Sequence, residues 1–282
     1  MFFLCGHPVL WPELGVVLLS LTIIAALYSS VGHGGGSGYL AVLSLTTIAV
    51  SDPLWLKQYA WSLNLIVAGI AFWHFRGEGH LDWGLTVPFL IGSIPMAALG
   101  GYVQLEGVAY DVLLSLVLVF AAWRLLWSSL EEKGVSRPAT LTAVASGGGI
   151  GLASGMIGVG GGIFLSPLLI LSGWANAKEA AATAALFIWL NSLSGLVGSS
   201  MSGGFGIELD MFAPFAGAVL VGGLLGSKYG SEISSQTRIR RLLVAVLLFA
   251  AAKRVLGVLG LSLIHISEPT RRTPISYAVF CL

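Results

Sequence analysis

The chain has 282 residues, of which 56% are hydrophobic and only 10% charged, with a formal net charge of +1. Soluble domains carry about 25% charged residues, so this composition excludes a soluble globular protein and indicates an integral membrane protein. The near-neutral charge shows no nucleic-acid-binding surface, and the two cysteines, Cys5 and Cys281, indicate no disulfide framework or metal site. We therefore expect no cofactor.

Apolar segments long enough to be membrane helices follow one another along the chain. A spanning helix needs about 20 mostly apolar residues. In the first half we predict segments at residues 14–31, 39–50, 57–75, 82–103 and 110–130. The polar stretch 131–138 separates these from second-half segments at 140–157, 163–171, 177–200, 210–229 and 241–259. The sequence therefore predicts an all-α integral membrane protein.

Two glycine-rich stretches interrupt long apolar segments. They are Gly32-His33-Gly34-Gly35-Gly36-Ser37-Gly38 and Gly158-Val159-Gly160-Gly161-Gly162. Glycine costs about 1 kcal/mol per residue inside a helix relative to alanine, so several together predict that the helix stops and restarts. Interrupted helices in corresponding positions of two halves are typical of a transporter's binding site.

The two halves match each other in order, at an offset of 126 to 130 residues. Besides the glycine stretches, the matching pairs are Leu63-Asn64 with Leu190-Asn191, Leu81-Asp82 with Leu209-Asp210, and Phe120-Ala121-Ala122-Trp123-Arg124 with Phe249-Ala250-Ala251-Ala252-Lys253-Arg254. We predict about eight membrane segments as two four-segment repeats, at 1–130 and 139–260, joined by the loop 131–138.

The orientation of the repeats has two solutions. If each broken segment crosses the membrane once, each half has four crossings and the repeats are parallel. If each broken segment is a hairpin that returns, each half has three crossings and the repeats are inverted. The inverted arrangement places the basic residues outside the apolar segments on one side, except Lys57, which agrees with the positive-inside rule.

The glycine breaks are the first candidates for a binding site. A restarted helix presents free N–H groups and the positive end of its dipole, which together bind anions. We predict substrate contacts from the central glycines of each break, namely Gly34, Gly35, Gly36, Gly160, Gly161 and Gly162. The alternative is that these glycines only permit close helix packing.

Four polar side chains within apolar segments are further candidates: Asn64, Asn191, Arg124 and Arg254. The two amides could bind substrate oxygens or could form interhelical hydrogen bonds. The two arginines suit an oxyanion, but both lie near segment ends, where arginine also reaches the headgroups.

Three other ionisable residues have simpler explanations. His33 lies inside the first break and could carry a proton, but the second break has Val159 there, so the fold does not require it. Asp82 and Asp210 begin apolar segments, where an N-cap explains both.

The last part of the chain, residues 261–282, differs from the rest. Leu261-Ser262-Leu263-Ile264-His265-Ile266-Ser267-Glu268-Pro269-Thr270-Arg271 resembles the translation of a transposase-type sequencing adapter, and 275–282 resembles the end of its flanking primer. We interpret 261–282 as a non-native tail and exclude it from fold reasoning.

The motifs resemble those of the sulfite exporter TauE/SafE family of membrane permeases. The resemblance covers about residues 14 to 260 and includes Pro167, which follows the second break in Gly158-x-Gly160-Gly161-Gly162-x-x-x-x-Pro167. The first break lacks such a proline. The resemblance implies a multi-pass protein of the bacterial inner membrane that carries small anions such as sulfite, sulfonates or sulfoacetate.

These observations give three functional hypotheses. The first is secondary transport, with export as the expected direction, of a small anion through a site formed by both breaks. The second is a passive anion channel with the same architecture. The third is an intramembrane serine protease, because Gly35-Gly36-Ser37-Gly38 resembles the rhomboid nucleophile motif and His74 or His80 would serve as base. We expect the first, with no enzymatic activity.

Overall fold

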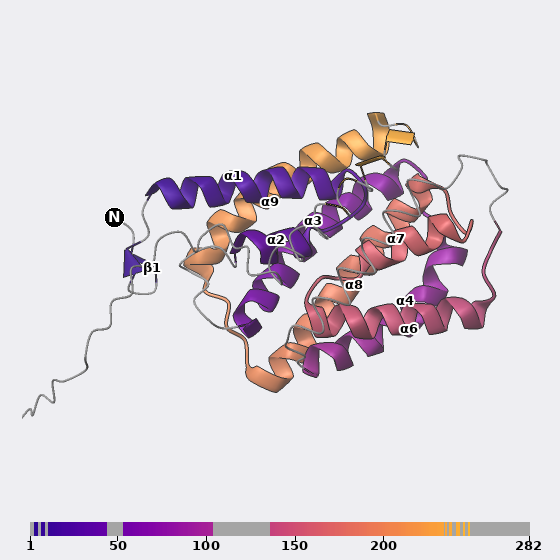
Figure 1. The fold of residues 1–282 in the computed structure, drawn as a ribbon, viewed down its shortest axis with the longest axis horizontal. Helices are drawn as coiled ribbons and strands as arrows, with labels where there is room; N and C mark the ends of the chain where they lie inside the picture. Colours follow the sequence, from indigo (N-terminus) through magenta and orange to yellow (C-terminus); the bar gives the residue numbers. More distant parts are fainter. Residues whose placement is uncertain are drawn as a thin grey trace, which may run out of the picture.

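The computed structural model describes residues 3–4, 7–8, 11–43, 53–103 and 136–233, and scattered positions from 235 to 248. These contain the helices α1 (Trp11–Ser29), α2 (Gly36–Leu43), α3 (Pro53–Gly77), α4 (Trp83–Tyr102), α6 (Thr140–Ile157), α7 (Gly162–Leu171), α8 (Ala177–Gly203) and α9 (Leu209–Lys228), which the π-helix η2 (Tyr229–Ile233) continues (Figure 1). Two short antiparallel strands, β1 (Phe3–Leu4) and β2 (His7–Pro8), precede them. The predicted segment 110–130, most of 241–259 and the tail 261–282 lie outside the described residues.

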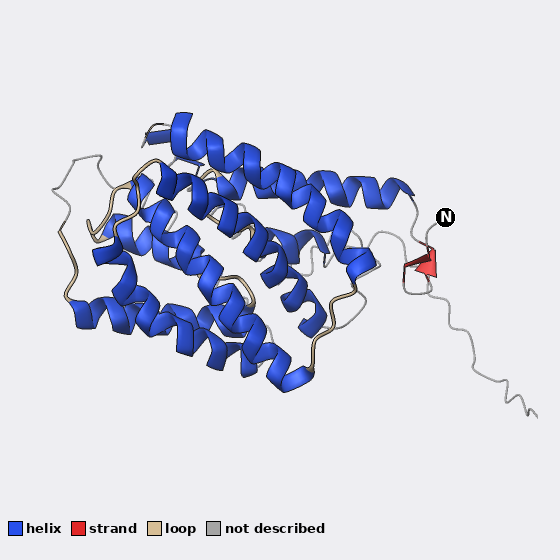
Figure 2. Ribbon diagram, turned by 180° about the vertical axis from the view of Figure 1, so that it is seen from behind, coloured by secondary structure: helices blue, strands red, loops and turns tan. Residues whose placement is uncertain are grey.

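The all-α architecture predicted from the sequence is confirmed. Figure 2 shows a bundle of helices joined by short loops. Within the described residues, four helices are long and apolar enough to cross a membrane by length and composition: Trp83–Tyr102, Thr140–Ile157, Ala177–Gly203 and Leu209–Glu232. Helix α3 has 25 residues, but it carries several polar side chains. The molecule is therefore a multi-pass membrane protein.

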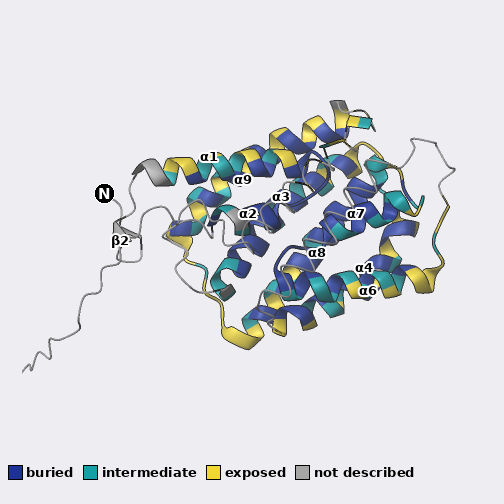
Figure 3. Cartoon of the chain, viewed as in Figure 1, coloured by how far each residue is buried: buried dark blue, intermediate teal, exposed yellow. Residues whose placement is uncertain are grey.

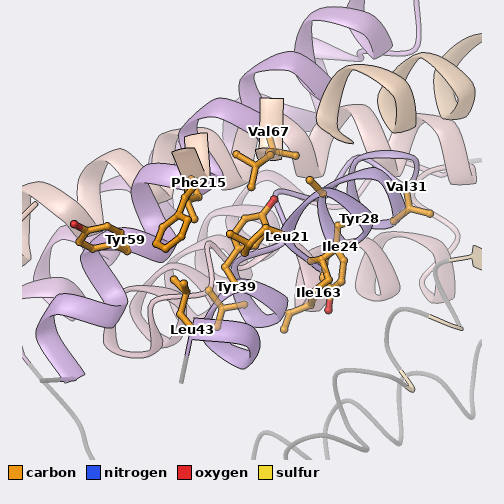
Figure 4. Packing of buried hydrophobic residues seen from close by; sticks show 14 of the residues in the cluster. Leu21, Ile24, Tyr28, Val31, Tyr39, Leu43, Tyr59, Val67, Ile163 and Phe215 are labelled. Carbon is orange, nitrogen blue, oxygen red and sulfur yellow. The ribbon is translucent and has the colours of Figure 1, made fainter. Parts of the chain in front are cut away.

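The first broken segment is a hairpin. The chain turns back after Ser29, so that α2 packs along α1. Tyr28 Oη lies 3.0 Å from Ser37 Oγ, and a Cβ on Gly38 would lie 2.5 Å from Ile24 Cγ2. Figure 4 shows the result, with Tyr39 of α2 returning beside the apolar face of α1. An uninterrupted helix would instead separate residues 24 and 38 by about 21 Å.

The second broken segment returns in the same way. Ser136, just before α6, donates its backbone N–H to the carbonyl of Gly173, just after α7, at 3.0 Å. The chain therefore leaves α7 beside the place where it entered α6. Both broken segments have the hairpin form that the inverted arrangement requires.

Helices α4 and α6 pack through glycine with almost no side chain between them. A Cβ on Gly92 of α4, or on Gly147, Gly151 or Gly155 of α6, would collide with backbone of the other helix. The contacting pairs are Phe89 with Gly147, Ser93 with Gly151, and Ala97 with Gly155. Because the numbers rise together, the two helices are parallel.

Helices α1 and α9 pack in the same manner. The contacting pairs are Thr22 with Gly222, Ala26 with Gly226, and Ser30 with Gly230, where the last glycine belongs to η2. Glycine at every fourth position forms a stripe on one face, which lets two backbones approach closely in a membrane. These two helices are also parallel. In both contacts, the first helix of one predicted repeat (α1 or α6) packs on the third long helix of the other repeat (α9 or α4).

The remaining contacts give the direction of every long helix. Helix α3 is antiparallel to α8, since Gln58 meets Ser199 and Asn64 meets Ser192. Helix α3 is parallel to α9, since Tyr59 meets Glu208 and His74 meets Ser227. Helix α4 is parallel to α8, because Thr86 bonds Thr183 and Gly101 packs on Gly195.

Corresponding helices of the two predicted repeats therefore run in opposite directions. This holds for α1 and α6, for α3 and α8, and for α4 and α9. The observation favours inverted repeats over parallel ones. The segment predicted as the third full crossing of the first repeat, residues 110–130, lies outside the described part of the chain, so the repeat boundaries stay a prediction.

Helices α3 and α8 form the centre of the bundle, and the other helices surround them (Figure 3). The apolar window of α8 is 67% buried, against 33% for that of α9. Outward faces carry large apolar side chains, such as Val16, Leu19, Ile23 and Leu27 along α1. In a bilayer these faces contact lipid, and α3 and α8 are left to form any polar site in the interior.

The two aspartates at predicted helix starts differ in role. Asp82 is the N-cap of α4, where its Oδ1 accepts the N–H of Gly84 at 2.8 Å, and its Oδ2 pairs with Arg137 at 2.7 Å. The N-cap expectation is wrong for Asp210, because α9 begins two residues earlier than expected, at Leu209, with Glu208 at the cap position. Asp210 lies in the first turn and is exposed.

We therefore expect Asp82→Ala to lower the free energy of unfolding by about 1 kcal/mol, the usual cost of a lost N-cap. The matched change Asp210→Ala is expected to cost about 0.3 kcal/mol, because only the helix dipole interaction is lost. Thermal unfolding of the purified variants in one detergent measures both. Equal losses in the two variants would contradict the assignment of the cap.

Candidate binding site at the two helix breaks

The first break, residues 30–35, is held inside the protein. Gly32 and Gly35 have φ of +74° and +93°, which side-chain-bearing residues rarely adopt. A Cβ on Gly32 would also collide with the backbone of Ala181 in α8. Residues 30 to 39 are all buried. The non-helical backbone of the break is therefore shielded from lipid, and the N–H groups of residues 30 to 33 bond to carbonyls at the end of α1, as a membrane protein requires.

The second break, residues 158–161, has the same character. Gly158 ends α6 in the left-handed conformation and donates its N–H to Ser154 at 2.9 Å. Gly160 and Gly161 follow with φ of +81° and +83°, and Gly161 caps the start of α7. The helices restart at Gly36 and Gly162, so these two predicted break residues are the first residues of α2 and α7.

The two breaks meet at Asn64 of α3 and Ile188 of α8. A Cβ on Gly34 would lie 2.5 Å from Asn64 Oδ1 and 3.1 Å from Ile188 Cγ2. A Cβ on Gly160 would lie 3.0 Å from Asn64 Nδ2 and 2.8 Å from Ile188 Cγ2. Gly162 abuts Ile188 as well. Four of the six predicted glycines, Gly34, Gly36, Gly160 and Gly162, thus lie around one side chain from each central helix, whereas Gly35 faces Tyr39 and Gly161 faces Phe187.

Asn64 only partly satisfies its hydrogen-bonding capacity. Its Nδ2 lies 3.4 Å from the Val159 carbonyl and 3.4 Å from Ser192 Oγ, so the interhelical bond considered from the sequence does form. Its Oδ1 has no partner among the described residues. Asn191 is fully buried, and within the described chain neither atom of its amide is bonded.

Several other buried polar atoms lack partners within the described residues. They are His33 Nε2, Tyr39 Oη, Trp61 Nε1, Ser154 Oγ and Ser166 Oγ. They come from the two broken segments and from α3. An unmet buried polar group costs about 1–3 kcal/mol, so a cluster of them calls for a ligand or ordered water.

The restarted helices add donors to this cluster. The first N–H groups of a helix have no partner inside it, and the helix dipole is positive there. Helices α2 and α7 begin at Gly36 and Gly162, and a Cβ on either would approach a polar side chain of the cluster, Asn64 Nδ2 at 2.6 Å and His33 Cδ2 at 3.4 Å. The arrangement is suited to hold a small anion without a charged side chain in contact.

Lys57 is a residue that sequence reasoning did not assign to the site. It is buried on α3, and a Cβ on Gly158 would lie 2.9 Å from its Cγ. It is seven residues before Asn64, which places both on one face of α3 about 10 Å apart. The sequence did hold a signal, because Lys57 was the one basic residue on the opposite side in the inverted arrangement.

Two of the predicted site residues, Arg124 and Arg254, lie outside the described residues. The pairing needed for a serine protease is not found in the part of the chain that the structure describes. Ser37 Oγ bonds the hydroxyl of Tyr28. The two candidate bases face α9 and η2 instead, with His74 Nδ1 at 2.6 Å from Ser227 Oγ and His80 Nε2 at 3.3 Å from the carbonyl of Ser231.

Comparison with known proteins gives consistent matches. A family model described as "Sulfite exporter TauE/SafE" matches residues 17–254. The chain is 34% identical over 241 residues to "Probable membrane transporter protein y4hK" of Sinorhizobium fredii, with 83% of this chain and 95% of that protein covered. It is 24% identical over 281 residues to "Probable membrane transporter protein YunE" of Bacillus subtilis, covering 89% and 97%. No solved structure matches the chain.

Proposed function

Because the chain belongs to the sulfite exporter TauE/SafE family of membrane transporters, we propose that it exports a small oxyanion, such as sulfite or a sulfonate, across the bacterial inner membrane. Transport is secondary, and the anion binds between the two glycine breaks. Gly34 and Gly160 line the site, Asn64 and Asn191 supply amides, and the starts of α2 and α7 supply backbone N–H groups.

One observation carries this proposal. Both helix restarts lie beside Asn64 or Ile188, and two buried polar atoms there, Asn64 Oδ1 and His33 Nε2, are without hydrogen-bond partners among the described residues. Glycine packing alone would not leave buried hydrogen-bonding atoms unpaired, since such atoms are nearly always satisfied in native proteins.

Ligand binding to the purified protein tests the proposal. We expect sulfite or ethanesulfonate to raise the unfolding temperature in detergent, whereas equal concentrations of chloride leave it unchanged. A ligand at a hundredfold excess over its Kd stabilises the folded state by about 2.7 kcal/mol. No shift with any sulfur oxyanion would overturn the proposed substrate class and leave the fold as it is.

Counterflow in proteoliposomes separates a transporter from the alternative of a passive channel. Vesicles are loaded with unlabelled ethanesulfonate, and entry of trace labelled ethanesulfonate is followed. A transporter with a site that alternates between the two sides shows faster labelled entry when the inside is loaded. Entry that does not respond to loading would contradict transport by alternating access.

A further inference from the structure

The first break presents a hydrogen-bond acceptor, His33 Nε2, in the protein interior. The other ring nitrogen, Nδ1, lies 2.9 Å from the carbonyl oxygen of Val31. A carbonyl only accepts, so Nδ1 carries the hydrogen and the neutral ring presents a lone pair at Nε2. His33 is 1% exposed, and its Nε2 makes no hydrogen bond of acceptable geometry among the described residues, although the backbone of Gly162 lies beside the ring.

Asn64 presents a second acceptor by the same reasoning. Its amide group contacts the carbonyl of Val159, which only accepts, so the nitrogen Nδ2 must face it. The oxygen Oδ1 is then directed elsewhere. It lies at Gly34, where a Cβ would be 2.5 Å away, and it has no bonding partner in the described chain.

Both acceptors lie at the place where the two breaks meet. His33 and Gly34 are adjacent in the chain, and His33 Cδ2, which is bonded to Nε2, would be 3.4 Å from a Cβ on Gly162. Gly34 and Gly162 in turn both abut Ile188. The acceptors therefore flank the volume that receives the first N–H groups of α7.

A fully deprotonated oxyanion can satisfy only the donors of such a site. Its oxygens accept from the helix N–H groups, but they offer nothing to His33 Nε2 or Asn64 Oδ1. Two buried acceptors left unmet would cost affinity, because each forfeits its bonds to water. A ligand that also carries a donor reduces this cost: an ammonium has hydrogens for both acceptors, and a hydroxyl or an acid O–H has one hydrogen and satisfies one of them.

We propose that the site selects small oxyanions that carry a hydrogen-bond donor of their own, and that His33 Nε2 and Asn64 Oδ1 accept from this donor. This inference rests on the proposed function, since it names the substrate class of the same site. In this binding mode the charged group of the ligand accepts hydrogen bonds from the N–H groups of the restarted helices. The hydrogen-bond donor of the ligand points toward α3 and the first break. His33 thus sets specificity without exchanging a proton.

A pair of sulfonates of equal charge and equal size tests the selection. Isethionate (2-hydroxyethanesulfonate) and 1-propanesulfonate differ only by a terminal hydroxyl in place of a methyl group. Isothermal titration of the full-length protein at a single pH is expected to show about tenfold tighter binding of isethionate, which corresponds to about one good hydrogen bond. Equal binding of the two by the unmodified protein would overturn the selection and leave the anion site intact.

Substitution of His33 assigns the selection to this residue. In His33→Val, which installs the residue found at the corresponding position 159, the two sulfonates are expected to bind within twofold of each other. His33→Phe keeps an aromatic ring of similar volume but has no acceptor nitrogen. It replaces His33→Val in this comparison if the valine variant does not fold. His80→Val, outside the site, is expected to keep the tenfold preference. A preference that survives in both His33 variants would overturn the role of His33, and no binding of either sulfonate to any of the proteins would overturn the anion site itself.

Discussion

Gly34→Ala is expected to lower affinity for sulfite and sulfonates by at least about tenfold, because the added methyl group occupies the binding volume. Its Cβ would lie 2.5 Å from Asn64 Oδ1 and 3.1 Å from Ile188 Cγ2. Gly34 does not have a left-handed φ, so alanine is compatible with its backbone. The variant should therefore fold and lose binding, and titration of the purified protein measures the loss.

Gly149→Ala is the matched control for this experiment. Gly149 is exposed on α6, and a Cβ there meets nothing within 4 Å. Alanine in a helix interior is favoured over glycine by up to about 1 kcal/mol, so this variant should bind normally and melt slightly higher. Normal binding by Gly34→Ala would contradict the location of the site between the breaks.

Gly226→Ala is expected to lower the free energy of unfolding by about 3 kcal/mol, the upper end of the cost of overpacking a well-packed interior. Its Cβ would collide with the carbonyl oxygen of Ala26 and with Ser29 Oγ, so α1 and α9 would have to separate. A collision with backbone cannot be relieved by a rotamer change, which is why we expect a large effect.

The same substitution on the opposite face of α9 provides the comparison. Gly217 is exposed, and a Cβ there meets nothing within 4 Å, so Gly217→Ala should be neutral or stabilising. Thermal unfolding of the two variants in one detergent compares them directly. If both variants melt at the temperature of the unmodified protein, the close packing of α1 on α9 is wrong.

Much of the fold could be predicted from the sequence because its signals are local. Glycine clusters such as 158–162 favour the end of a helix because the cost lies in the backbone itself, although a cluster alone does not decide it, since Gly147, Gly148 and Gly149 lie inside α6. The short apolar limbs after each break, such as 163–171, are too short to cross a bilayer and already favoured a hairpin. The pairing of α1 with α9 could not be predicted, because a stripe of glycines shows where a helix packs closely but carries no information on its partner.

Some residues of the candidate site could also be predicted from the sequence, because their signal is local. Asn64 and Asn191 stand out in the sequence because an amide in an apolar segment needs a partner wherever the fold places it. Ser192 could be recognised only from the three-dimensional arrangement, and the one sequence signal for Lys57 was its exception to the distribution of basic residues in the inverted arrangement. Lys57 contacts Gly158 because α3 happens to pass the end of α6, and Ser192 is one of many serines in small-residue helices.

The crossed pairing of the helices determines which parts of the molecule can move as rigid bodies. A rocking motion of residues 1–130 against 139–260 would break both glycine interfaces at once, since α1 is packed on α9 and α4 on α6. By the same criterion the closely packed units are the α1–α9 pair and the group of α4, α6 and α8, since Gly198 of α8 packs on the backbone of Ala98 in α4. Each unit is built from both halves of the sequence, and we expect any change that exposes the site first to one side and then to the other to occur where the two units meet, along α3.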